Sequence, residues 1–444
     1  MLNSLQNISP NIDRRVLVIG AYGFIGASLV MRLQREGFIV SGFGRSQATA
    51  YKVMPDINWH IADLKNMITA DDWQDHAKTY DIIVNCAGAL QDGASDSLKT
   101  VHFDAIKALS DVCKSNQIKL IQISAVGAEL DADTAFMRTK AMGDDYIRKN
   151  HTDYNIFRPG LVLAKNAYGG SALLRMLAAF PLVQPIALAN SQVQTTSIYA
   201  LTDAVVLAAN NQVPKNKSYD LIERQTHSLR EVVQETRHWL GFSSAVWHIT
   251  LPNWSTQITA KIANFLSLLG WKSPLRSTAM SVLESGIKGD PAPWKDVTKQ
   301  DLLPLKSALA HMPAAAEDRL FARLSLLMPL IIFCLAVFWL TSGIIGLWQV
   351  DRAASVLTDI GWSDHIAKLS VRFWSIVDIA LGLGVLIRKS AKLACWAMIA
   401  VSLIYLISAA VVTPQLWTDP LGPMVKVFPG IVLALIGRVT LDNR

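Results

Sequence analysis

Two hydrophobic patterns divide the chain near residue 324. Before it, short apolar runs rich in Val and Ile alternate with amphipathic stretches of helical period. This alternation predicts βαβ units, because strands buried on both faces are continuous apolar runs, whereas each connecting helix buries one face only. The predicted strands are 15–20, 39–42, 82–86, 119–124 and 154–158. We therefore expect an α/β fold with a doubly wound parallel sheet.

The second pattern, from 324 to 444, is apolar over much longer distances. A helix needs ~20 apolar residues to cross a bilayer. Four stretches come close to or exceed that length: 324–350, 371–387, 393–418 and 421–441. We predict an all-α bundle of four transmembrane helices over 324–444. Asp378 lies deepest within a span, and it is either a functional group or the partner of Arg372 or Lys426.

Basic residues next to these spans predict their orientation. They fall on one side of the predicted membrane: Arg319, Arg323, Arg388, Lys389, Lys392, Arg438 and Arg444. Lys and Arg accumulate on the cytoplasmic side, so we expect a multi-pass protein of the inner (cytoplasmic) membrane with cytoplasmic N- and C-termini. The first thirteen residues are polar and lack the apolar region of a signal peptide, which also predicts a cytosolic N-terminus.

Composition narrows the classes of function. Hydrophobic residues make up 51% of the chain and charged residues 17%, as expected of a protein that meets lipid. The net charge of +7 is not gathered in a basic block, so we expect no nucleic-acid partner. The four cysteines form no close pair and no metal-ligand spacing, so we predict no metal site and a reducing compartment.

A glycine-rich turn follows the first predicted strand and precedes a helical pattern. Glycines at these spacings permit the tight turn, the approach of backbone amides to a pyrophosphate and close packing of the helix. The strand and helix on either side favour a dinucleotide site over a plain turn. The residues we expect to bind the cofactor here are Gly20, Tyr22, Gly23, Phe24, Ile25 and Gly26.

The end of the next strand bears on which dinucleotide binds. A carboxylate there would hold a ribose diol, whereas a basic residue accommodates a 2′-phosphate. The strand ends in Arg45 and Ser46 without a carboxylate. NADP(H) is therefore favoured over NAD(H), with a solvated Arg45 as the alternative.

The first part of the chain, over about 14–250, resembles the extended and atypical short-chain dehydrogenases, an epimerase/dehydratase-like Rossmann family. The resemblance rests on these residues: Gly20, Gly23, Gly26, Asp63-Leu64, Asn85-Cys86-Ala87-Gly88, Ile123-Ser124-Ala125, Lys140 and Arg158-Pro159-Gly160. Among the subgroups it is most similar to the branch that contains the NADPH-binding accessory subunit of respiratory complex I and related proteins of ubiquinone assembly.

This resemblance implies roles for individual residues. Asp63 and Leu64 would cap the adenine, and Ala87 and Gly88 would pass under the cofactor. Pro159 and Gly160 would begin the substrate region. Lys140 would bind the nicotinamide ribose, and Ser124 would hydrogen-bond a substrate oxygen; these two are the candidate catalytic residues.

One position departs from the family pattern. The family's catalytic Tyr-x-x-x-Lys is replaced by Phe136-Met137-Arg138-Thr139-Lys140, and a phenyl ring has no proton to transfer. Cofactor binding therefore survives this change better than carbonyl reduction does. His102 lies where the family places residues near the cofactor, although a lone histidine is more often a satisfied core residue.

The chain divides on this basis into 1–250, the NAD(P)-binding domain, 251–323, a substrate-side or membrane-proximal helical segment, and 324–444. In the middle segment, Ile258, Ile262 and Phe265 share one helical face. Either an interfacial helix or a core helix fits this pattern, and the nearby first span favours the membrane.

The last part, over about 325–441, resembles the DoxX-like four-helix membrane family. The resemblance rests on 417–423, followed by Lys426 and Pro429. Some members of that family are associated with quinone-linked oxidation. The expected function is thus a membrane-anchored NAD(P)(H)-binding oxidoreductase acting on a lipophilic, quinone- or isoprenoid-like substrate. The alternative is a non-catalytic NADPH-binding assembly or redox-sensing protein. The partners considered are a lipophilic small-molecule substrate, membrane lipid and a membrane protein.

Overall fold

The computed structural model describes residues 13–90, 92, 97–271, 277–420 and 422–441. The chain divides into two compact units. The first comprises Met1–Ala260 and Pro274–Arg319, and the second comprises Lys261–Ser273 and Leu320–Arg444. The segment 251–323 is thus shared between the two units.

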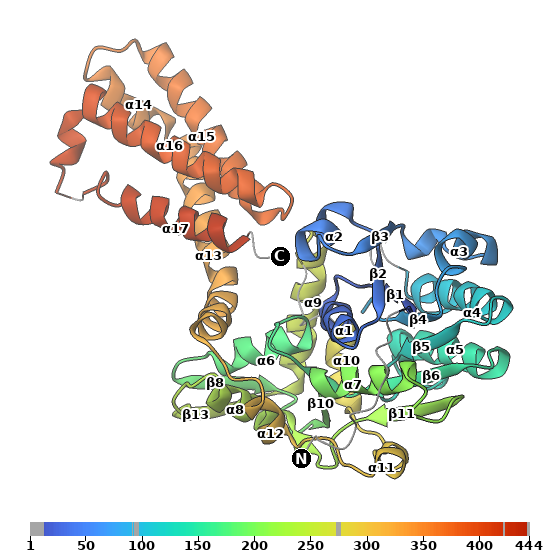
Figure 1. Cartoon of the computed structure of the whole chain (residues 1–444). Coiled ribbons are helices and arrows are strands. Elements are labelled where there is room, and N and C mark those ends of the chain that lie inside the picture. Colours follow the sequence, from blue (N-terminus) through green and yellow to red (C-terminus); the bar gives the residue numbers. More distant parts are fainter. Residues whose placement is uncertain (1–12, 91, 93–96, 272–276, 421, 442–444) are drawn as a thin grey trace. The chain divides into compact units, whose positions relative to one another are not determined.

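The first unit is built on a parallel sheet of seven strands (Figure 1). In spatial order the strands are β11 (Lys217–Leu221), β6 (Tyr154–Pro159), β5 (Lys119–Ile123), β4 (Ile82–Asn85), β1 (Arg15–Ile19), β2 (Ile39–Gly44) and β3 (Asn58–Ile61). The order reverses direction beside β1, so β1 and β4 flank the crevice where doubly wound folds bind ligands. The predicted α/β class with a doubly wound parallel sheet is confirmed.

Helices cover both faces of this sheet (Figure 1). The helices of the βαβ connections are α1 (Phe24–Arg35), α2 (Gln47–Val53), α3 (Ala70–Ala77), α4 (Ala105–Ser115), α5 (Ala135–Asn150) and α7 (Ile198–Ala209), with the short turns η1 (Leu64–Asn66) and η2 (Thr100–Asp104). The core beneath α3 and α4 includes Trp73, whose indole donates to the carbonyl of Met67 at 2.9 Å. Burial of the Trp73 ring in this core holds the helices against the sheet.

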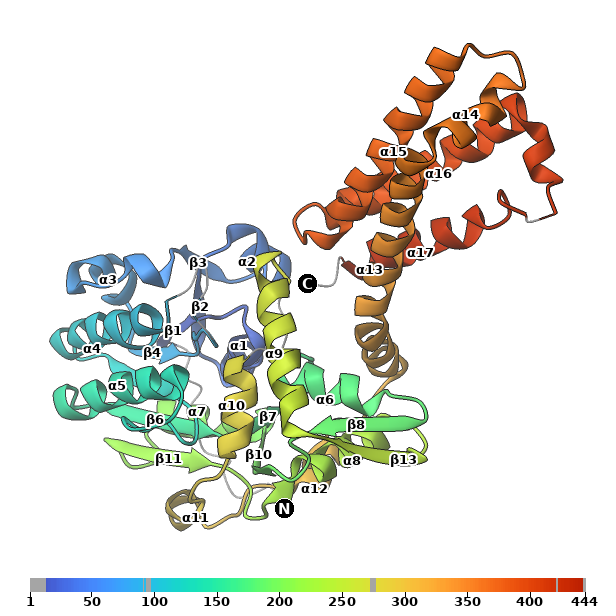
Figure 2. The ribbon, with the colours of Figure 1, turned by 180° about the vertical axis from the view of Figure 1, so that it is seen from behind.

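A smaller subdomain of the first unit follows β6. It consists of three two-stranded ribbons and the helices between them. The strands are β7 (Leu161–Leu163) with β10 (Thr195–Ser197), β8 (Val183–Ala187) with β13 (Trp247–Leu251), and β9 (Gln192–Val193) with β12 (His227–Ser228). The helices are α6 (Gly170–Ala178), α8 (Leu229–Trp239), α10 (Ser277–Ser285), α11 (Ala292–Thr298) and α12 (Leu305–Ala310), seen from behind in Figure 2. Helix α9 (Asn253–Leu268) begins in this unit, and its residues from Lys261 onward belong to the second unit.

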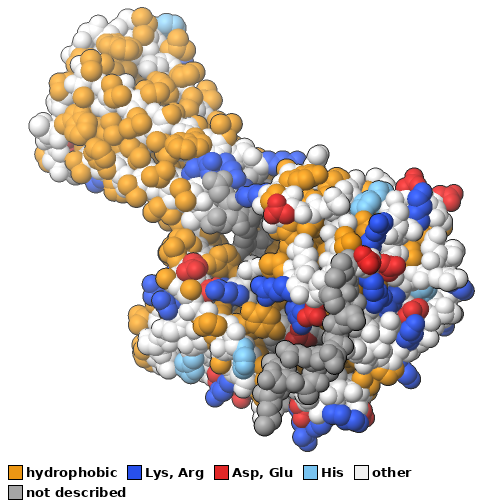
Figure 3. Space-filling view, in the orientation of Figure 1, with side chains coloured by type: hydrophobic (Ala, Val, Ile, Leu, Met, Phe, Trp, Pro, Cys, Tyr) orange, Lys and Arg blue, Asp and Glu red, His pale blue; other side chains and the backbone are white. Residues whose placement is uncertain are grey.

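The second unit is a bundle of apolar helices. These are α13 (Ala316–Trp348), α14 (Val350–Thr358), α15 (Asp364–Leu386), α16 (Ala391–Val412) and α17 (Val427–Thr440), with the turn η3 (Pro414–Trp417). By length and composition, α13, α15 and α16 can each cross a membrane. Their outer surface is apolar (Figure 3), as expected of helices surrounded by lipid. The predicted membrane domain is confirmed in this form.

The predicted fourth span corresponds to α17. This helix has 14 residues and rises about 21 Å, less than the ~30 Å of a hydrocarbon core. It packs on α16 and is one of the shorter apolar helices of the chain. A fourth crossing stays a prediction.

Asp378 connects three helices of the bundle. Its carboxylate accepts hydrogen bonds from the hydroxyls of Ser342 on α13, at 2.7 Å, and Tyr405 on α16, at 2.8 Å. Of the two readings of Asp378, the pairing with Arg372 or Lys426 is not found among the described residues, where the hydrogen bonds to this carboxylate come from hydroxyls. Neutral donors satisfy a buried carboxyl without bringing a second charge into the bundle.

Candidate functional site

The glycine-rich turn between β1 and α1 has the backbone geometry that its sequence predicts. Gly20 has a φ of +76°, which L side chains rarely adopt. The amide of Gly23 donates to the Gly20 carbonyl at 2.8 Å and closes the turn. A Cβ at Gly26 would lie 2.2 Å from that same carbonyl oxygen. The three glycines therefore serve three different requirements, and their contact with a cofactor stays a prediction.

The N-terminus of α1 opens at this turn. Gly23 is the N-cap and offers no side-chain acceptor, and no acidic residue lies in the described first turn. The first amides of a helix are unsatisfied within the helix and carry partial positive charge. These amides, on Phe24, Ile25 and Gly26, suit a pyrophosphate.

Tyr22 lies at the end of β2, next to the two residues that sequence analysis connects with dinucleotide choice. Its hydroxyl oxygen accepts from the backbone amides of Arg45, at 3.1 Å, and Ser46, at 3.3 Å. Its ring lies so close to Gly44 that a Cβ there would be 2.3 Å from Tyr22 Cε1. A phenolic oxygen that accepts two N–H groups still has its own proton to donate. The Tyr22 hydroxyl thus accepts from two backbone amides and presents one O–H donor of its own at the end of β2.

Asp63 and Leu64 follow β3, the strand next to β2. The amide of Ala62 donates to the carbonyl of Gly44 at 3.1 Å, which brings the two strand ends together. Asp63 caps η1 by accepting from the amide of Lys65 at 3.2 Å. Leu64 packs against the main core. The geometry thus places both residues beside the end of β2, where the resemblance expects an adenine.

The segment after β4 passes the glycine turn closely. A Cβ on Gly20 would lie 3.1 Å from the Cα of Ala87. Asn85 holds the segment: its side-chain oxygen accepts from the Ala87 amide at 3.1 Å, and its nitrogen donates to Gln122 at 2.9 Å. Gly88 follows, and a Cβ on this residue would lie 3.3 Å from His102 Nε2. The ends of β1 and β4 therefore form one continuous backbone surface.

His102 is held in one protonation state by its neighbours. Its Nε2 accepts from the amide of Ala89 at 3.1 Å, and its Nδ1 lies 3.0 Å from Thr139 Oγ1. That hydroxyl donates to the Ala135 carbonyl, so Nδ1 is the protonated nitrogen. Burial, together with the nearby charge of Lys140, holds the pKa of His102 well below its usual value. The imidazole is neutral and its single proton is engaged.

Phe136 and Lys140 lie one helical turn apart on α5, on the face toward His102. The Phe136 ring stands edge-on to the imidazole with the centroids 5.5 Å apart. The ammonium of Lys140 lies 5.7 Å from the centre of the Phe136 ring and donates to the Ile123 carbonyl at 3.3 Å. These three side chains gather at the ends of β4 and β5. The site has a cation and an aromatic ring where the related family has a cation and a phenol.

Lys140 and Ser124 share a buried environment with Asp144. Lys140 is 8% exposed and Asp144 fully buried, four residues apart on α5. Burial lowers the pKa of the Lys140 ammonium and raises the pKa of the Asp144 carboxyl, while their mutual attraction opposes both changes. The Ser124 hydroxyl lies beside this carboxyl without a hydrogen bond of ordinary geometry among the described residues. It therefore keeps its capacity to bind another group.

Pro159 and Gly160 lie where β6 leaves the sheet. The carbonyl of Pro159 accepts from the Val126 amide at 3.1 Å, and the amide of Gly160 donates to Thr196 Oγ1 at 2.8 Å. A Cβ at Gly160 would meet the carbonyl oxygen of Gln194 at 2.3 Å. The turn directs the chain into the smaller subdomain. This is the position at which the resemblance expects the substrate region to begin.

The arrangement suits a dinucleotide in shape and donors. The glycine turn and the α1 N-terminus offer backbone amides, the end of β2 offers a hydroxyl and a guanidinium, and Lys140 offers an ammonium. For proton transfer it is poor, because Phe136 has no acidic proton and the described His102 proton is engaged by Thr139. The predicted site residues are thus brought to one edge of the sheet, and their roles stay predictions.

Comparison with protein families agrees with this division of the chain. The model of a family described as NAD(P)H-binding matches residues 20–176. The model of the DoxX-like family matches residues 336–435. The chain therefore combines a domain that matches an NAD(P)H-binding family with one that matches the DoxX-like family, and the predicted division into an NAD(P)-binding and a DoxX-like part is confirmed.

Individual relatives make the comparison more specific. The NADH dehydrogenase (ubiquinone) 1 alpha subcomplex subunit 9, mitochondrial, of Dictyostelium discoideum is 26% identical over 148 residues, 33% of this chain and 41% of that protein. The chain spans about two fifths of the length of the curated relatives it matches.

Solved structures agree on the fold. The Bordetella bronchiseptica enzyme WbmH in complex with NAD+ superposes with a TM-score of 0.51 at 14% identity, covering 70% of this chain and 98% of that one. The ADP-L-glycero-D-manno-heptose-6-epimerase of Helicobacter pylori has a TM-score of 0.50 at 14% identity, covering 69% and 97%. At such identity the likeness establishes an epimerase-like fold.

Two features of the site escaped sequence analysis. Asp144 is fully buried beside Lys140, and the only sequence signal was their spacing of four on one helix. Thr139 decides the tautomer of His102, but its contact depends on how η2 packs against α5. η2 is a π-helical turn, a rare form found often at functional sites, and it carries no sequence signature.

Proposed function

We propose that the protein is a membrane-anchored NADP(H)-binding protein in which the nucleotide serves assembly or redox sensing. The observation that carries this proposal is the environment of Phe136. The site keeps its phosphate-binding turn and Lys140, yet Phe136 and the neutral His102 supply no proton to a carbonyl. General acid catalysis contributes about 10²–10⁴-fold to such reactions. A site with binding groups and no acid retains affinity and loses turnover.

The relative in Dictyostelium discoideum supports the same proposal. Its name describes a subunit of a larger NADH dehydrogenase (ubiquinone) subcomplex. A chain of this kind with its own membrane helices suits a membrane protein as partner. The bound nucleotide would then order the ends of β1, β2 and β4, which a partner could recognise.

The preference for NADP(H) rests on the end of β2. The Tyr22 hydroxyl accepts from the backbone amide of Arg45 there, and residues 39–46 include no carboxylate. A 2′-phosphate accepts hydrogen bonds and attracts cations, whereas a bare ribose diol prefers a carboxylate. Tyr22 and Arg45 would therefore both bind the 2′-phosphate.

Hydride transfer to a lipophilic acceptor is a second candidate. The apolar cluster of Ala128, Met137 and Ala141 is extended by Phe136 and by Val282 of α10. An acceptor such as a quinone, which takes its protons from solvent, needs little from an enzymic acid. The apolar surroundings and the membrane spans suit such an acceptor, for which Ser124 and Lys140 would be the polar contacts.

We further propose an orientation in the inner membrane. The loop between α15 and α16 carries Arg388 and Lys389, Lys392 lies in the first turn of α16, and Arg438 lies in the last turn of α17. Basic residues accumulate on the cytoplasmic side of a membrane. The N-terminal domain and the C-terminus would accordingly lie in the cytoplasm, where NADP(H) is available.

The test uses the full-length protein in detergent. NADPH binding is followed by the change in nucleotide fluorescence, and NADPH consumption is followed in the same sample with a short-chain quinone and with native lipid extract. The proposal expects saturable binding without consumption beyond the protein-free rate. Saturable binding with steady turnover would replace it by the second candidate.

Gly26→Ala serves as the control for the site. Its Cβ would collide with the backbone carbonyl of Gly20, which cannot move aside as a flexible side chain can. Gly430→Ala is the matched variant, because its Cβ would meet only Phe338 at 3.9 Å. We expect Gly26→Ala to abolish binding and Gly430→Ala to retain it. Equal binding by both variants would refute the assignment of the nucleotide site.

A further inference from the structure

Helix α9 exposes its large apolar residues and buries its small ones. Trp254, Ile258, Ile262, Phe265 and Leu268 are 65%, 50%, 55%, 63% and 82% exposed. At 100° per residue they fall within an arc of roughly 120°. The opposite side is packed through Ala260 and Ala263, which are 7% and 4% exposed. A helix in water has the reverse arrangement.

The C-terminal end of α9 is fastened to the bundle within the second unit. The amide of Arg388 donates to the Leu269 carbonyl at 2.9 Å, and the Trp271 indole donates to the Leu386 carbonyl at 2.6 Å. The Arg388 guanidinium lies 5.7 Å from the centre of the Trp271 ring. Leu386 is the last residue of α15, a candidate membrane span. The exposed apolar stripe therefore starts at the end of a membrane-crossing helix, at the level of the lipid headgroups.

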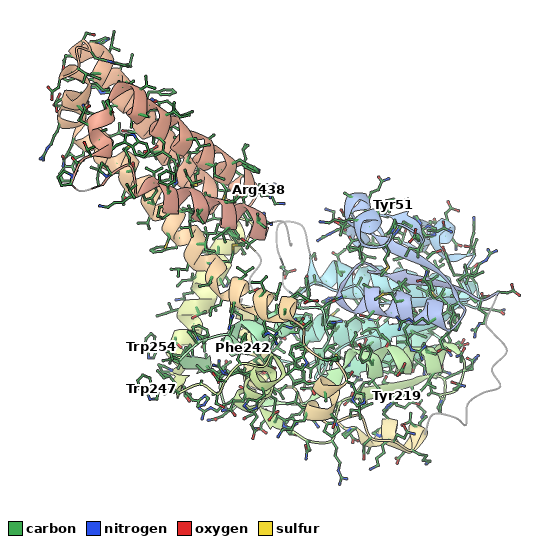
Figure 4. All side chains as sticks on the ribbon, turned by 60° about the vertical axis from the view of Figure 1, so that its left-hand side comes forward. Tyr51, Tyr219, Phe242, Trp247, Trp254 and Arg438 are labelled. Atoms are coloured by element: carbon green, nitrogen blue, oxygen red, sulfur yellow. The ribbon has the colours of Figure 1, made fainter. Side chains whose placement is uncertain are left out.

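The charges at this level have one sign. Arg388 and Lys389 occupy the loop between α15 and α16, Lys392 lies in the first turn of α16, and Lys261 is exposed on α9 within the arc of the apolar side chains. Arg438 ends α17 at the same end of the bundle (Figure 4), and the Arg388 guanidinium donates to the Leu441 carbonyl at 2.9 Å. No Asp or Glu lies between residues 257 and 271 or between 379 and 418. A basic rim beside an apolar stripe is the composition of helices that lie on anionic membranes.

We propose that α9, with the loop between α15 and α16, forms an interfacial anchor that binds anionic phospholipid. The apolar stripe lies at the boundary between headgroups and acyl chains, and Lys261 and Lys389 contact lipid phosphates. Trp254 is at the far end of the stripe and points away from the ribbon (Figure 4). Its amphipathic ring suits the interface. This anchor is independent of what the nucleotide does.

Protein is the alternative to lipid as the partner that covers the apolar stripe. Either the nucleotide-binding unit or a second copy of the chain could cover it. Lipid is favoured because the hydrogen bonds to Leu386 and Arg388 determine the depth of α9 in the membrane. The basic rim also complements anionic headgroups, whereas a protein surface would need matching carboxylates.

The test is photocrosslinking in lipid nanodiscs made of equal parts phosphatidylcholine and phosphatidylglycerol. Phe265→benzoylphenylalanine is introduced into the full-length protein, and the photoadducts are identified by mass spectrometry of the labelled peptide. The anchor predicts phospholipid adducts with phosphatidylglycerol enriched over phosphatidylcholine. Because one lysine near an anionic surface is worth about 1 kcal/mol, Lys389→Gln should lower this enrichment about fivefold.

The matched control is Leu303→benzoylphenylalanine. Leu303 is 45% exposed in the first unit, before α12, and should give no phospholipid adduct. Adducts from position 265 to residues 13–260, or to a second chain, would overturn the proposal. A probe that is quenched by water and forms no adduct would also overturn it. Nucleotide binding by the crosslinking variant shows that the protein is folded.

Discussion

The ring of Phe136 stands edge-on to the imidazole of His102, with the two centroids 5.5 Å apart. The Lys140 ammonium also lies 5.7 Å from the centre of this ring. The position of a Cβ on Gly88 is 3.3 Å from His102 Nε2 and 3.8 Å from Lys140 Nζ, so the phenyl ring, the neutral histidine and the buried cation form one cluster. The cation is stabilised by the ring face, and no group of this trio delivers a proton.

Phe136→Tyr adds the missing hydroxyl to this trio. We expect the Kd for NADPH to stay within about twofold, because the ring keeps its contacts, and NADPH-dependent reduction of a lipophilic ketone to appear. The nearby Lys140 cation favours the ionised phenol and so makes it a better acid. Initial rates of NADPH oxidation measure this gain. Phe136→Leu is the control, and a native protein as fast as Phe136→Tyr would contradict the proposed loss of acid catalysis.

Acidification should weaken the fold through His102. The unfolded histidine binds a proton near its ordinary pKa of about 6.5, whereas burial lowers the pKa in the folded protein. Below that pH the unfolded state holds the additional proton, so stability falls as pH falls, by up to about 1.4 kcal/mol per pH unit. Melting temperatures between pH 8 and pH 5 measure this slope.

The variant His102→Asn separates this contribution from those of His60 and His151, whose pKa values burial also lowers. Its melting temperature should fall less steeply below pH 6.5 than that of the native protein. Parallel curves for His102→Asn and the native protein would show that His102 is not held neutral.

Tyr22→Phe removes the O–H donor at the end of β2 and keeps the ring. We expect NADPH affinity to fall about fivefold to tenfold, since hydrogen bonds to charged groups are worth about 1.5–3 kcal/mol and solvent screens this edge. NADH affinity should change less than twofold. Tyr51→Phe on α2, an exposed tyrosine, is the matched control. Fluorescence titrations with both nucleotides measure these affinities. Equal losses of affinity for NADPH and NADH would assign Tyr22 a general structural role.

Arg175 and Asp318 form a buried ion pair at 2.8 Å, with side chains 4% and 7% exposed. Arg175 also donates to the Ala164 carbonyl at 2.9 Å and lies over the Trp239 ring. Removing one partner leaves a buried charge, so Arg175→Met should cost about 3–5 kcal/mol. Thermal unfolding measures the loss.

The double variant Arg175→Met with Asp318→Asn is the test of this explanation. It removes both charges and should recover part of the loss, because no uncompensated ion remains. An effect equal to the sum of the single variants would show that the two side chains act independently. Asp318 lies in the first turn of α13, so the ion pair also holds the start of this helix in the first unit.

The sequence predicted those parts of the fold that bury uninterrupted apolar runs. β1, β4 and β5 were found because they are central strands covered on both faces. β3 and β11 were missed, since Asn58–Ile61 and Lys217–Leu221 mix polar with apolar residues at the two edges of the sheet. Edge strands take their register from the neighbouring strand more than from their own pattern.

The candidate site was predictable where backbone geometry demands a residue type. Gly20 and Gly26 are such positions, because φ and close approach exclude side chains. The partners of Asp378 were not predictable, because Ser342 and Tyr405 come from distant helices and hydroxyls are common in apolar spans. Charge alone suggested Arg372 and Lys426, yet the bundle satisfies this carboxylate with neutral donors.

Whether the protein binds NADPH without oxidising it is decided by measuring NADPH binding and NADPH consumption on one sample of full-length protein in nanodiscs. Binding is followed by nucleotide fluorescence, and consumption by absorbance after native lipid extract is added. We predict saturable binding that Gly26→Ala abolishes, and no consumption above the protein-free rate until Phe136 is changed to Tyr. Sustained consumption by the native protein would contradict it and establish a reductase that works without the phenol.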